Sequence, residues 1–380
     1  MASNSGRGAM QDVVVIGAGP AGLALGACLK AQGLEPLILE REATIGSAWR
    51  RHYDRLHLHT DKRRSGLPMR PYPASAPRYI PRQQVVEYPE DYAQHFGLSP
   101  RLNCAVEKVE QIAGGWRVTA GGQQIETRAV IPATGVSEVP RYGDWPGLDG
   151  FPGPVLHTRD YRRPADLPGQ RVLVIGFGNS GGELAMDLAE DGRQVDMVVR
   201  SPVNLLPKEL FGQPIGNFAL LQKIFPYRVV DVLTAPILRA KIGDYAQYGL
   251  QKSPKGPNAQ VREDGRIPLI DLGTLGMIKA GKITVRPGIE RLDGNSVTFV
   301  DGSTGAYDAI LMATGYGVDL RPMFGDMPGL LDDSGRPLES ARQMAPGLWF
   351  CSYHTVPNGQ LKEISLQAPR IAAEVAAFLG

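Results

Sequence analysis

The sequence reads VVVIGAGPAGLALGACL from Val13 to Leu29 and VLVIGFGNSGGELAMDL from Val172 to Leu188. In each copy an apolar strand runs into G-x-G-x-x-G and then into a helix. The first glycine permits a tight turn, the second lets the backbone approach a pyrophosphate, and the third lets the helix pack on the strand. The N-terminus of the helix then faces the anion. Two copies in the same strand-turn-helix context predict two dinucleotide-binding sites.

The residues after each motif distinguish the two nucleotides. The strand that follows the first motif ends in Glu40, a carboxylate that accepts hydrogen bonds from ribose hydroxyls and repels a 2′-phosphate. The matching strand after the second motif ends in Arg200 and Ser201, a cation and a hydroxyl suited to a 2′-phosphate. The sequence therefore predicts FAD at the first motif and NADPH at the second.

A second repetition supports the first. Short strands broken by glycine pairs run from Asn103 to Gly135, and a similar series broken by Asp-Gly turns runs from Ile283 to Gly315. Both series close on Ala-Thr-Gly. The predicted fold is α/β, with two nested Rossmann-like dinucleotide-binding domains that each carry an antiparallel β-meander insertion. We predict an FAD domain over 8–165 and 306–380, with a last helix over Gln367–Leu379, and an NADPH domain over 166–305.

Composition narrows the class of protein. The chain has 380 residues, a net charge of +2 and 21% charged residues, so no strong field indicates a nucleic-acid or anionic membrane partner. The cysteines Cys28, Cys104 and Cys351 form no C-x-x-C, which argues against a metal site and a dithiol flavoreductase and favours a cytoplasmic location. No apolar run is long enough to span a membrane. We expect a small-molecule substrate, and the sequence leaves monomer and homodimer open.

One segment has two interpretations. Phe218 to Ile242 is apolar at helical spacing and is interrupted by Pro226 and Pro236. It is either a pair of helices that cover a core, or a wall of the substrate pocket or a membrane-surface patch.

The chain resembles the class B flavin-containing monooxygenases. Between the two glycine motifs, Phe151 to Tyr161 matches their F-x-G-x-x-x-H-x-x-x-(Y/F) signature, and Met312 to Tyr316 resembles their second ATG-Tyr motif. Within that family the chain is most similar to the plant YUCCA group of indole-3-pyruvate monooxygenases. The segments that carry this likeness are Tyr53–His59, Leu206–Glu209, Tyr248–Leu250 with Gly256–Pro257, and Pro268–Gly273 with Ile278–Gly281.

The resemblance implies a reaction of FAD, NADPH and molecular oxygen as cosubstrate. NADPH passes hydride to FAD, oxygen adds at flavin C4a, and the bound nicotinamide excludes water from the peroxide. A deprotonated peroxide attacks a carbonyl, so an aryl α-keto acid such as indole-3-pyruvate would lose CO₂ to give the shorter acid. The alternatives are N- or S-oxygenation of a small amine or thioether, and a flavin reductase or electron-transfer module without oxygen insertion. A non-catalytic scaffold is the least favoured.

Three residues are candidates for catalysis. His59 stands where other flavin monooxygenases place an asparagine near the flavin, and it is either a partner of flavin or peroxide or a buried histidine satisfied by the backbone. Lys62 either pairs with a substrate carboxylate or is a solvated lysine. Asn358 lies in a C-terminal stretch that the resemblance places beside the flavin. The predicted cofactor-binding residues, with Trp49 equally open to a core position, are Gly17, Gly19, Pro20, Ala21, Gly22, Glu40, Arg41, Trp49, Val106, Thr134, Gly135, Gly176, Gly178, Asn179, Ser180, Gly181, Arg200, Ser201, Thr314 and Gly315.

Overall fold

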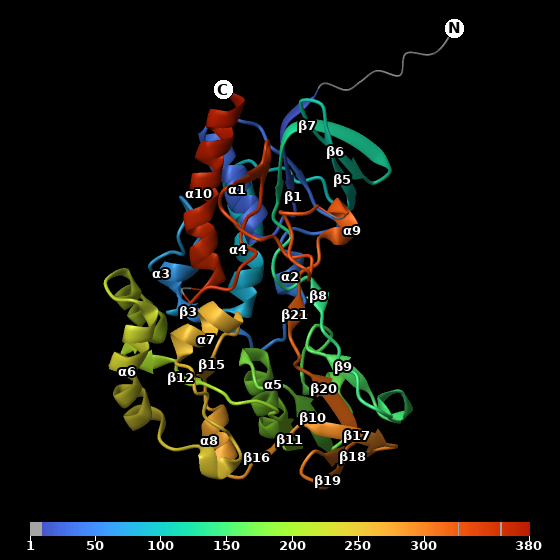
Figure 1. Ribbon diagram of the computed structural model, residues 1–380, viewed down its shortest axis with the longest axis vertical. Coiled ribbons are helices and arrows are strands. Elements are labelled where there is room, and N and C mark those ends of the chain that lie inside the picture. The colour runs from blue at the N-terminus through green and yellow to red at the C-terminus, as the bar shows by residue number, and fades with distance from the viewer. Residues whose placement is uncertain (1–9, 326, 358) are drawn as a thin grey trace.

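The computed structural model of the protein describes residues 10–325, 327–357 and 359–380. Its elements form two α/β units that follow one another along the longest axis of the molecule (Figure 1). Each unit is built on a sheet whose central strands are parallel. Asn358, predicted to lie near the flavin, falls outside the described residues.

The first sheet contains the first glycine motif and has the strand order β2-β1-β7-β23-β22. Its strands are β1 (Gln11–Ile16), β2 (Leu37–Leu39), β7 (Gln123–Pro132), β22 (Gln343–Ala345) and β23 (Leu348–Trp349). β1 runs parallel to both neighbours, with Val15 opposite Ile38 and Ile131. The predicted meander consists of β5 (Val106–Ile112), β6 (Gly115–Ala120) and β7. One long strand, β7, therefore belongs to the meander and to the parallel sheet.

The second sheet is parallel throughout and has the order β16-β11-β10-β20-β9. Its strands are β9 (Val155–His157), β10 (Arg171–Ile175), β11 (Gln194–Val198), β16 (Ile283–Arg286) and β20 (Ala309–Met312). Here the meander is a separate sheet of β17 (Ile289–Asp293), β18 (Ser296–Phe299) and β19 (Thr304–Ala306). The predicted fold class, α/β with two Rossmann-like units that each carry a meander, is confirmed.

The chain passes between the two units at β8 (Val139–Pro140) and β21 (Tyr316–Gly317), which pair antiparallel in the middle of the molecule (Figure 1). The second sheet includes β9 and β20, although the predicted limits assign both to the FAD domain. A division that keeps this sheet whole has to place 155–157 and 309–312 in the second unit. The exact domain limits stay a prediction.

Helices cover the sheets with their apolar faces. In the first unit α1 (Pro20–Ala31) packs between α10 (Gln360–Leu379) and α4 (Arg82–His95), and in the second α5 (Asn179–Glu190) packs on α8 (Thr274–Lys279). α10 begins at Gln360 and not at the predicted Gln367. The reason is that Gly359, with φ of +87°, turns the chain into the helix and brings Ile364 into the core.

Shorter elements fill the connections. Between β2 and β5 lie α2 (Ser47–Arg50), β3 (His57–Asp61), α3 (Lys62–Ser65), β4 (Tyr79–Pro81) and α4. Between β11 and β16 lie β12 (Leu205–Pro207), β13 (Glu209–Leu210), β14 (Gln213–Pro214), α6 (Tyr227–Ile242), α7 (Pro257–Asp264), β15 (Leu269–Asp271) and α8. α9 spans Arg321–Phe324, and 3-10 turns occupy Leu148–Gly150, Pro164–Asp166, Ile215–Lys223 and Ala246–Tyr248.

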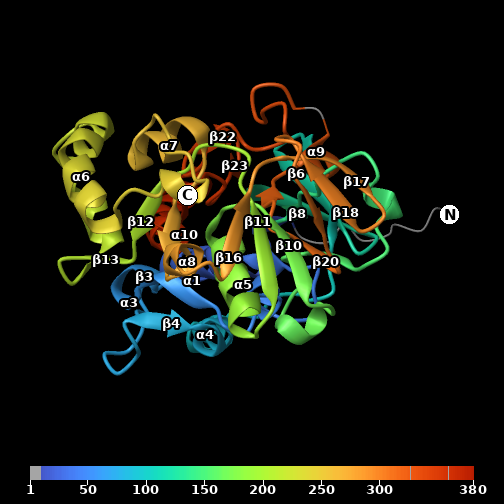
Figure 2. The ribbon, with the colours of Figure 1, turned by 90° about the horizontal axis from the view of Figure 1, so that it is seen from below.

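The apolar segment from Phe218 to Ile242 contains α6, which lies at the outer edge of the second unit (Figures 1 and 2). This helix buries only Val230 and Asp231, whereas Val232 is 73% exposed and Leu233 is 55% exposed. The first interpretation, a helix that covers a core, is therefore wrong for α6. Among the helices that the structure describes, none is long and apolar enough to cross a membrane.

Candidate functional site

The first glycine motif forms an open cradle at the start of α1. Gly17 has φ of +107°, and a Cβ there would lie 2.9 Å from the carbonyl oxygen of Ala133. A Cβ on Gly22 would lie 1.8 Å from the carbonyl oxygen of Gly17, so only glycine allows helix and strand to touch. Gly19 precedes Pro20 at the N-cap, without a side-chain cap, and nothing lies within 4 Å of its Cβ position. The first-turn N–H groups of α1 therefore fit a pyrophosphate.

Glu40 closes this cradle. It is buried at the end of β2, where its Oε2 accepts a hydrogen bond from the Ala18 N–H at 2.7 Å. Its Oε1 accepts from the Glu42 N–H at 3.0 Å. A carboxylate oxygen has a second lone pair, so Glu40 can hold the loop and still accept from a ribose hydroxyl. Its neighbour Arg41 is exposed and pairs with Glu138.

The second motif repeats the same geometry at the start of α5. Gly176 has φ of +119°, and a Cβ there would meet the Ala313 carbonyl oxygen at 2.4 Å. A Cβ on Gly181 would lie 2.3 Å from the Gly176 oxygen, and Gly178 is an open N-cap. In both units the Ala-Thr-Gly turn therefore packs against the first glycine of the motif. The backbone of the second cradle therefore fits a pyrophosphate in the same way as that of the first.

Two side chains predicted to contact the second nucleotide are held by the protein. The Asn179 Oδ1 accepts a hydrogen bond from the Ile270 N–H at 2.7 Å and so fixes β15. Ser180 lies beside the buried phenol of Tyr53, whose pKa burial raises well above its usual value. Around α5, the open donors are therefore those of the backbone.

Arg200, unlike Asn179 and Ser180, is not held by neighbouring residues. It is exposed just beyond β11, and the described residues offer it no hydrogen bond or ion pair. The half-buried Ser201 follows it. A free guanidinium at this strand end is placed as a 2′-phosphate contact requires.

The two Ala-Thr-Gly turns are fixed by neighbouring segments. Both the N–H and the hydroxyl of Thr134 lie within 3.0 Å of the hydroxyl of the buried Tyr353. The Thr314 hydroxyl donates to the carbonyl oxygen of Arg141. Gly135 and Gly315 both have positive φ, +91° and +80°, which lets the chain turn away directly after its strand.

Trp49 and Val106 remain compatible with cofactor binding. Trp49 is half-buried on α2, with its ring centroid 5.2 Å from that of His52, and it also packs against both neighbouring apolar clusters. Val106 is half-buried at the first position of β5. The packing contacts of Trp49 thus support a core position, and its contact with the flavin stays a prediction.

His59 and Glu183 join the two units. His59, on β3, contacts the carboxylate of Glu183 through Nε2, and Glu183 comes from α5 with only 4% of its side chain exposed. The buried-histidine interpretation had expected a backbone partner, which is wrong because a carboxylate fills that place. Glu183 was not predicted from the sequence. Its only signal is an acidic residue two positions after the third glycine, directly before the apolar residues Leu184, Ala185 and Met186.

A cavity of about 270 Å³ lies beside this contact. It is lined by Arg55, His57, Glu183, Lys208, Asp271 and Leu272. The Lys208 ammonium lies 3.8 Å from the centroid of the Tyr79 ring and has no hydrogen bond or ion pair among the described residues. Burial lowers the pKa of Lys208 from its ordinary value. Lys208 lies within Leu206–Glu209, one of the segments that carry the family likeness, but no role was predicted for it.

Lys62 does not share this cavity. Its ammonium donates hydrogen bonds to the carbonyl oxygens of Ala74 and Ala76, the latter at 2.6 Å. The solvated-lysine interpretation is therefore wrong, because the side chain holds the loop that follows α3. The Lys62 ammonium thus has hydrogen-bond partners in the protein, whereas the Lys208 ammonium has none among the described residues.

The signature histidine and tyrosine support the linker. His157 is buried beside the second Ala-Thr-Gly turn, where its Nε2 donates to the Gly315 oxygen at 3.2 Å. Burial lowers the pKa of His157. The Tyr161 hydroxyl donates to Asp187 at 2.7 Å. Both side chains are thus structural in this arrangement.

Comparison with known proteins identifies similar chains. The family model described as pyridine nucleotide-disulphide oxidoreductase matches residues 14–206. The indole-3-pyruvate monooxygenase YUCCA6 of Arabidopsis thaliana is 42% identical over 80% of this chain and 75% of its own length. YUCCA1 of Oryza sativa subsp. japonica, also an indole-3-pyruvate monooxygenase, is 38% identical over 85% of this chain and 79% of its own length.

Solved structures agree on the fold. A mutant flavin monooxygenase from Stenotrophomonas maltophilia is 25% identical, with a TM-score of 0.75 over 97% of this chain and 99% of that one. Cyclohexanone monooxygenase has the same TM-score at 18% identity, over 97% and 88% of the two chains. The three cysteines of this chain are free and buried. They provide no dithiol pair of the kind that the name of the matching family model suggests.

Proposed function

We propose an activity for this chain on the premise that it belongs to the family of flavin-containing monooxygenases that includes the plant YUCCA enzymes. It is therefore a single-component monooxygenase that depends on FAD and NADPH and uses molecular oxygen. The proposed reaction is oxidative decarboxylation of an aryl α-keto acid such as indole-3-pyruvate. One oxygen atom enters the arylacetic acid and the other leaves as water. NADPH supplies two electrons, and the carboxyl group leaves as CO₂.

The observation that carries the choice of substrate is the unpaired ammonium of Lys208. Among the other charged residues of its cavity, Glu183 is engaged by His59, and Arg55 by Asp187 and Glu190. Asp271 accepts hydrogen bonds from two backbone N–H groups at the start of α8. Lys208, which lies over the Tyr79 ring, is thus the one charge of the cavity without a hydrogen-bond or ion-pair partner among the described residues. It would attract the carboxylate of a keto acid and repel a protonated amine.

The two glycine cradles would hold the cofactors. FAD on the first cradle and NADPH on the second supply hydride transfer and activation of oxygen. Glu40 would accept from a ribose of FAD, and Arg200 would bind the 2′-phosphate of NADPH. The Cβ-free surfaces of Gly19 and Gly178 would let the backbone approach each pyrophosphate.

His59 would act at the edge of the cavity that Lys208 lines, through its contact with the lining residue Glu183. The Glu183 carboxylate accepts from Nε2 and so fixes the tautomer in which Nδ1 is an acceptor. An imidazole held in this way can take or return a proton at Nδ1. We assign Lys208 to binding of the carboxylate and His59 to proton handling near the reacting carbon.

The reaction is tested by product balance. Purified enzyme with NADPH and oxygen is given indole-3-pyruvate or phenylpyruvate, and the arylacetic acid, CO₂ and hydrogen peroxide are quantified against NADPH consumed. We expect acid and CO₂ to form in equal amounts and to account for most of the NADPH. Trimethylamine and a thioether should give no oxygenated product. Oxygenation of either of them, with neither keto acid decarboxylated, would replace this proposal with N- or S-oxygenation.

Lys208 is tested separately. Lys208→Met should raise the KM for the keto acid about tenfold or more, since a charge-assisted contact is worth about 1.5–3 kcal/mol. The rate at which NADPH reduces the bound FAD should stay the same. Lys62→Met is the matched control, because its ammonium is held by carbonyl groups outside the cavity, and we expect a KM close to that of the unmodified enzyme. An equal rise in KM in both variants would show that Lys208 does not bind the carboxylate.

A further inference from the structure

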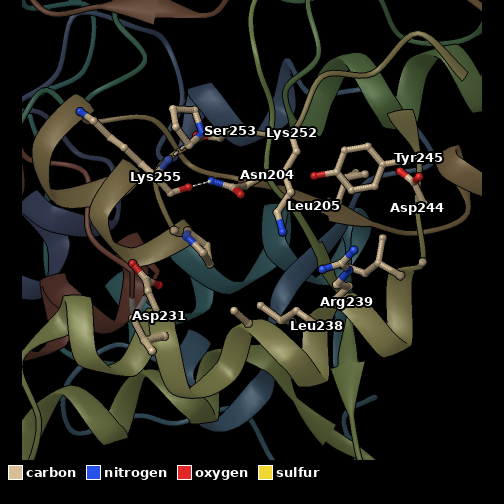
Figure 3. A pocket seen from close by; sticks show the side chains of 17 residues that line it. Asn204, Leu205, Asp231, Leu238, Arg239, Asp244, Tyr245, Lys252, Ser253 and Lys255 are labelled. Atoms are coloured by element: carbon tan, nitrogen blue, oxygen red, sulfur yellow. Dashed lines mark hydrogen bonds between the residues drawn. The ribbon is translucent and has the colours of Figure 1, made fainter. Parts of the chain in front are cut away.

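A second and larger cavity lies in the second unit, and no residue of either glycine motif lines it. It has a volume of about 440 Å³ and lies between α6, the start of β12 and the segment 252–257 (Figure 3). Its apolar wall is formed by Leu205, Val232, Ala235, Leu238 and Ile242. No residue lines both this cavity and the one beside Lys208. What is proposed for it therefore rests on residues that the reaction proposed above does not use.

Two cations enter this cavity without a partner. Arg239, from α6, and Lys252, from the facing segment, extend into the same space (Figure 3). Over the part of the chain that the structure describes, neither side chain makes a hydrogen bond or an ion pair. Both residues are exposed, and an anion bound between them would be attracted by both charges.

The carboxylates of the cavity do not supply that anion. Asp231 accepts hydrogen bonds from the N–H groups of Asn258 and Ala259, at 3.0 and 2.9 Å, and so caps α7. Asp244 accepts from the Ala246 N–H at 3.0 Å. The third cation, Lys255, is already paired with Asp264. Among the described residues neither Asp231 nor Asp244 forms an ion pair with Arg239 or Lys252, so both cations can interact with an anion from solution.

We propose that this cavity binds an organic monocarboxylate with an apolar body, an aryl or alkyl acid. The carboxylate lies between Arg239 and Lys252, and the apolar body rests on Leu238, Ala235 and Val232. The two parts of the cavity fit the two parts of such a molecule. A small inorganic anion would leave the apolar wall in water, and a neutral apolar molecule would leave the two cations uncompensated.

Binding of 2-naphthoate to the FAD-loaded enzyme, measured by titration calorimetry, tests this. Arg239→Gln combined with Lys252→Gln should weaken binding roughly tenfold or more, which corresponds to at least one charge-assisted contact. Lys241→Gln is the matched control, because Lys241 is an exposed cation of α6 that does not line the cavity. Lys208→Met removes the anion site beside Glu183, and naphthoate binding should persist in that variant.

A second variant keeps both cations. Ala235→Trp fills the cavity from α6 and should abolish naphthoate binding while the FAD content stays unchanged. Equal naphthoate affinity in the unmodified enzyme and in the Arg239/Lys252 double variant would overturn the proposal. So would equally tight binding of 2-naphthamide, or full displacement of naphthoate by an equal concentration of inorganic phosphate. Each of these results leaves the proposed decarboxylation untouched, because the two cavities share no residue.

Discussion

A methyl group on Gly22 would lie 1.8 Å from the carbonyl oxygen of Gly17, closer than any non-bonded carbon can approach. Gly22→Ala therefore forces α1 away from β1, and we expect loss of FAD and of soluble protein. The ratio of flavin to protein absorbance measures this. Gly276→Ala is the control, because this glycine of α8 has nothing within 4 Å of its Cβ position. That change should be neutral or stabilise by about 0.5–1 kcal/mol. Full flavin content in Gly22→Ala would contradict the assignment of the first cradle.

Arg200 offers a test of coenzyme choice. Its exposed guanidinium has no partner within the described residues, so its removal disturbs no other contact. Arg200→Ala should lower kcat/KM for NADPH roughly tenfold to a hundredfold, as expected for one charge-assisted contact, and should change that for NADH much less. Steady-state rates with both nicotinamides give the answer. Equal losses would mean that Arg200 supports the fold and does not read the 2′-phosphate.

Lys208 gives the keto-acid reaction a pH dependence. Only its protonated form binds a carboxylate, and burial lowers its pKa below the usual lysine value. The KM for phenylpyruvate should therefore rise as the pH increases through that lowered pKa, whereas at lower pH the ammonium is charged and KM is constant. Lys208→Arg keeps its charge at every accessible pH. Its KM should stay flat over the same range, and a rise identical to that of the unmodified enzyme would exclude Lys208 as the titrating group.

At the scale of elements, the contact between β3 and α5 is the one we would alter first. His59→Ala leaves the Glu183 carboxylate, 4% exposed, without its imidazole partner. We expect a loss of about 1–3 kcal/mol in the free energy of unfolding and more hydrogen peroxide per NADPH, because water reaches a site that the imidazole filled. His95→Ala is the control, since His95 is an exposed histidine at the end of α4 and lines neither cavity. Unchanged peroxide yield in His59→Ala would leave the contact a purely structural one.

The elements that could be predicted are those whose cause is local. The Gly-Gly and Asp-Gly breaks marked both meanders, and the apolar runs before Gly17 and Gly176 marked β1 and β10. What the sequence could not show is how distant elements join. The merging of the meander into the parallel sheet along β7 depends on the parallel pairing of β7 with β1, which lies far earlier in the chain. The exposure of α6 likewise depends on what packs against it, and its apolar spacing alone indicated a covered face.

In the whole molecule, the candidate site divides in the same way into residues placed by local patterns and residues placed by long-range contacts. The glycine motifs, Glu40 and Arg200 follow from local strand-turn-helix patterns, so their positions agree with expectation. Glu183 and Lys208 do not follow from such patterns, because each meets its neighbours only when the two units come together. Lys62 was a candidate on residue type alone. In the folded chain its ammonium donates hydrogen bonds to carbonyl oxygens of a nearby loop.

The junction of the two units also makes the molecule sensitive to acid. His52 lies beside Trp49, and burial first, then Arg162 and Arg82, lower its pKa to about 4, whereas the usual value is near 6.5. The unfolded chain binds this proton below pH 6.5 and the folded chain does not until near pH 4. Stability is therefore constant above pH 6.5 and falls as the pH decreases between these values, by about 2 kcal/mol from His52 alone between pH 7 and pH 5.

Urea unfolding of the FAD-loaded enzyme at pH 7 and at pH 5 measures this loss. His52→Gln removes the titrating group, so the difference between the two pH values should shrink by about 2 kcal/mol. His95→Gln, at the exposed end of α4, is the control and should leave the difference unchanged. His157 and His354 also have pKa values lowered by burial, so part of the acid loss should remain in the variant. If His52→Gln loses as much stability as the unmodified enzyme, the junction does not hold His52 in its neutral form.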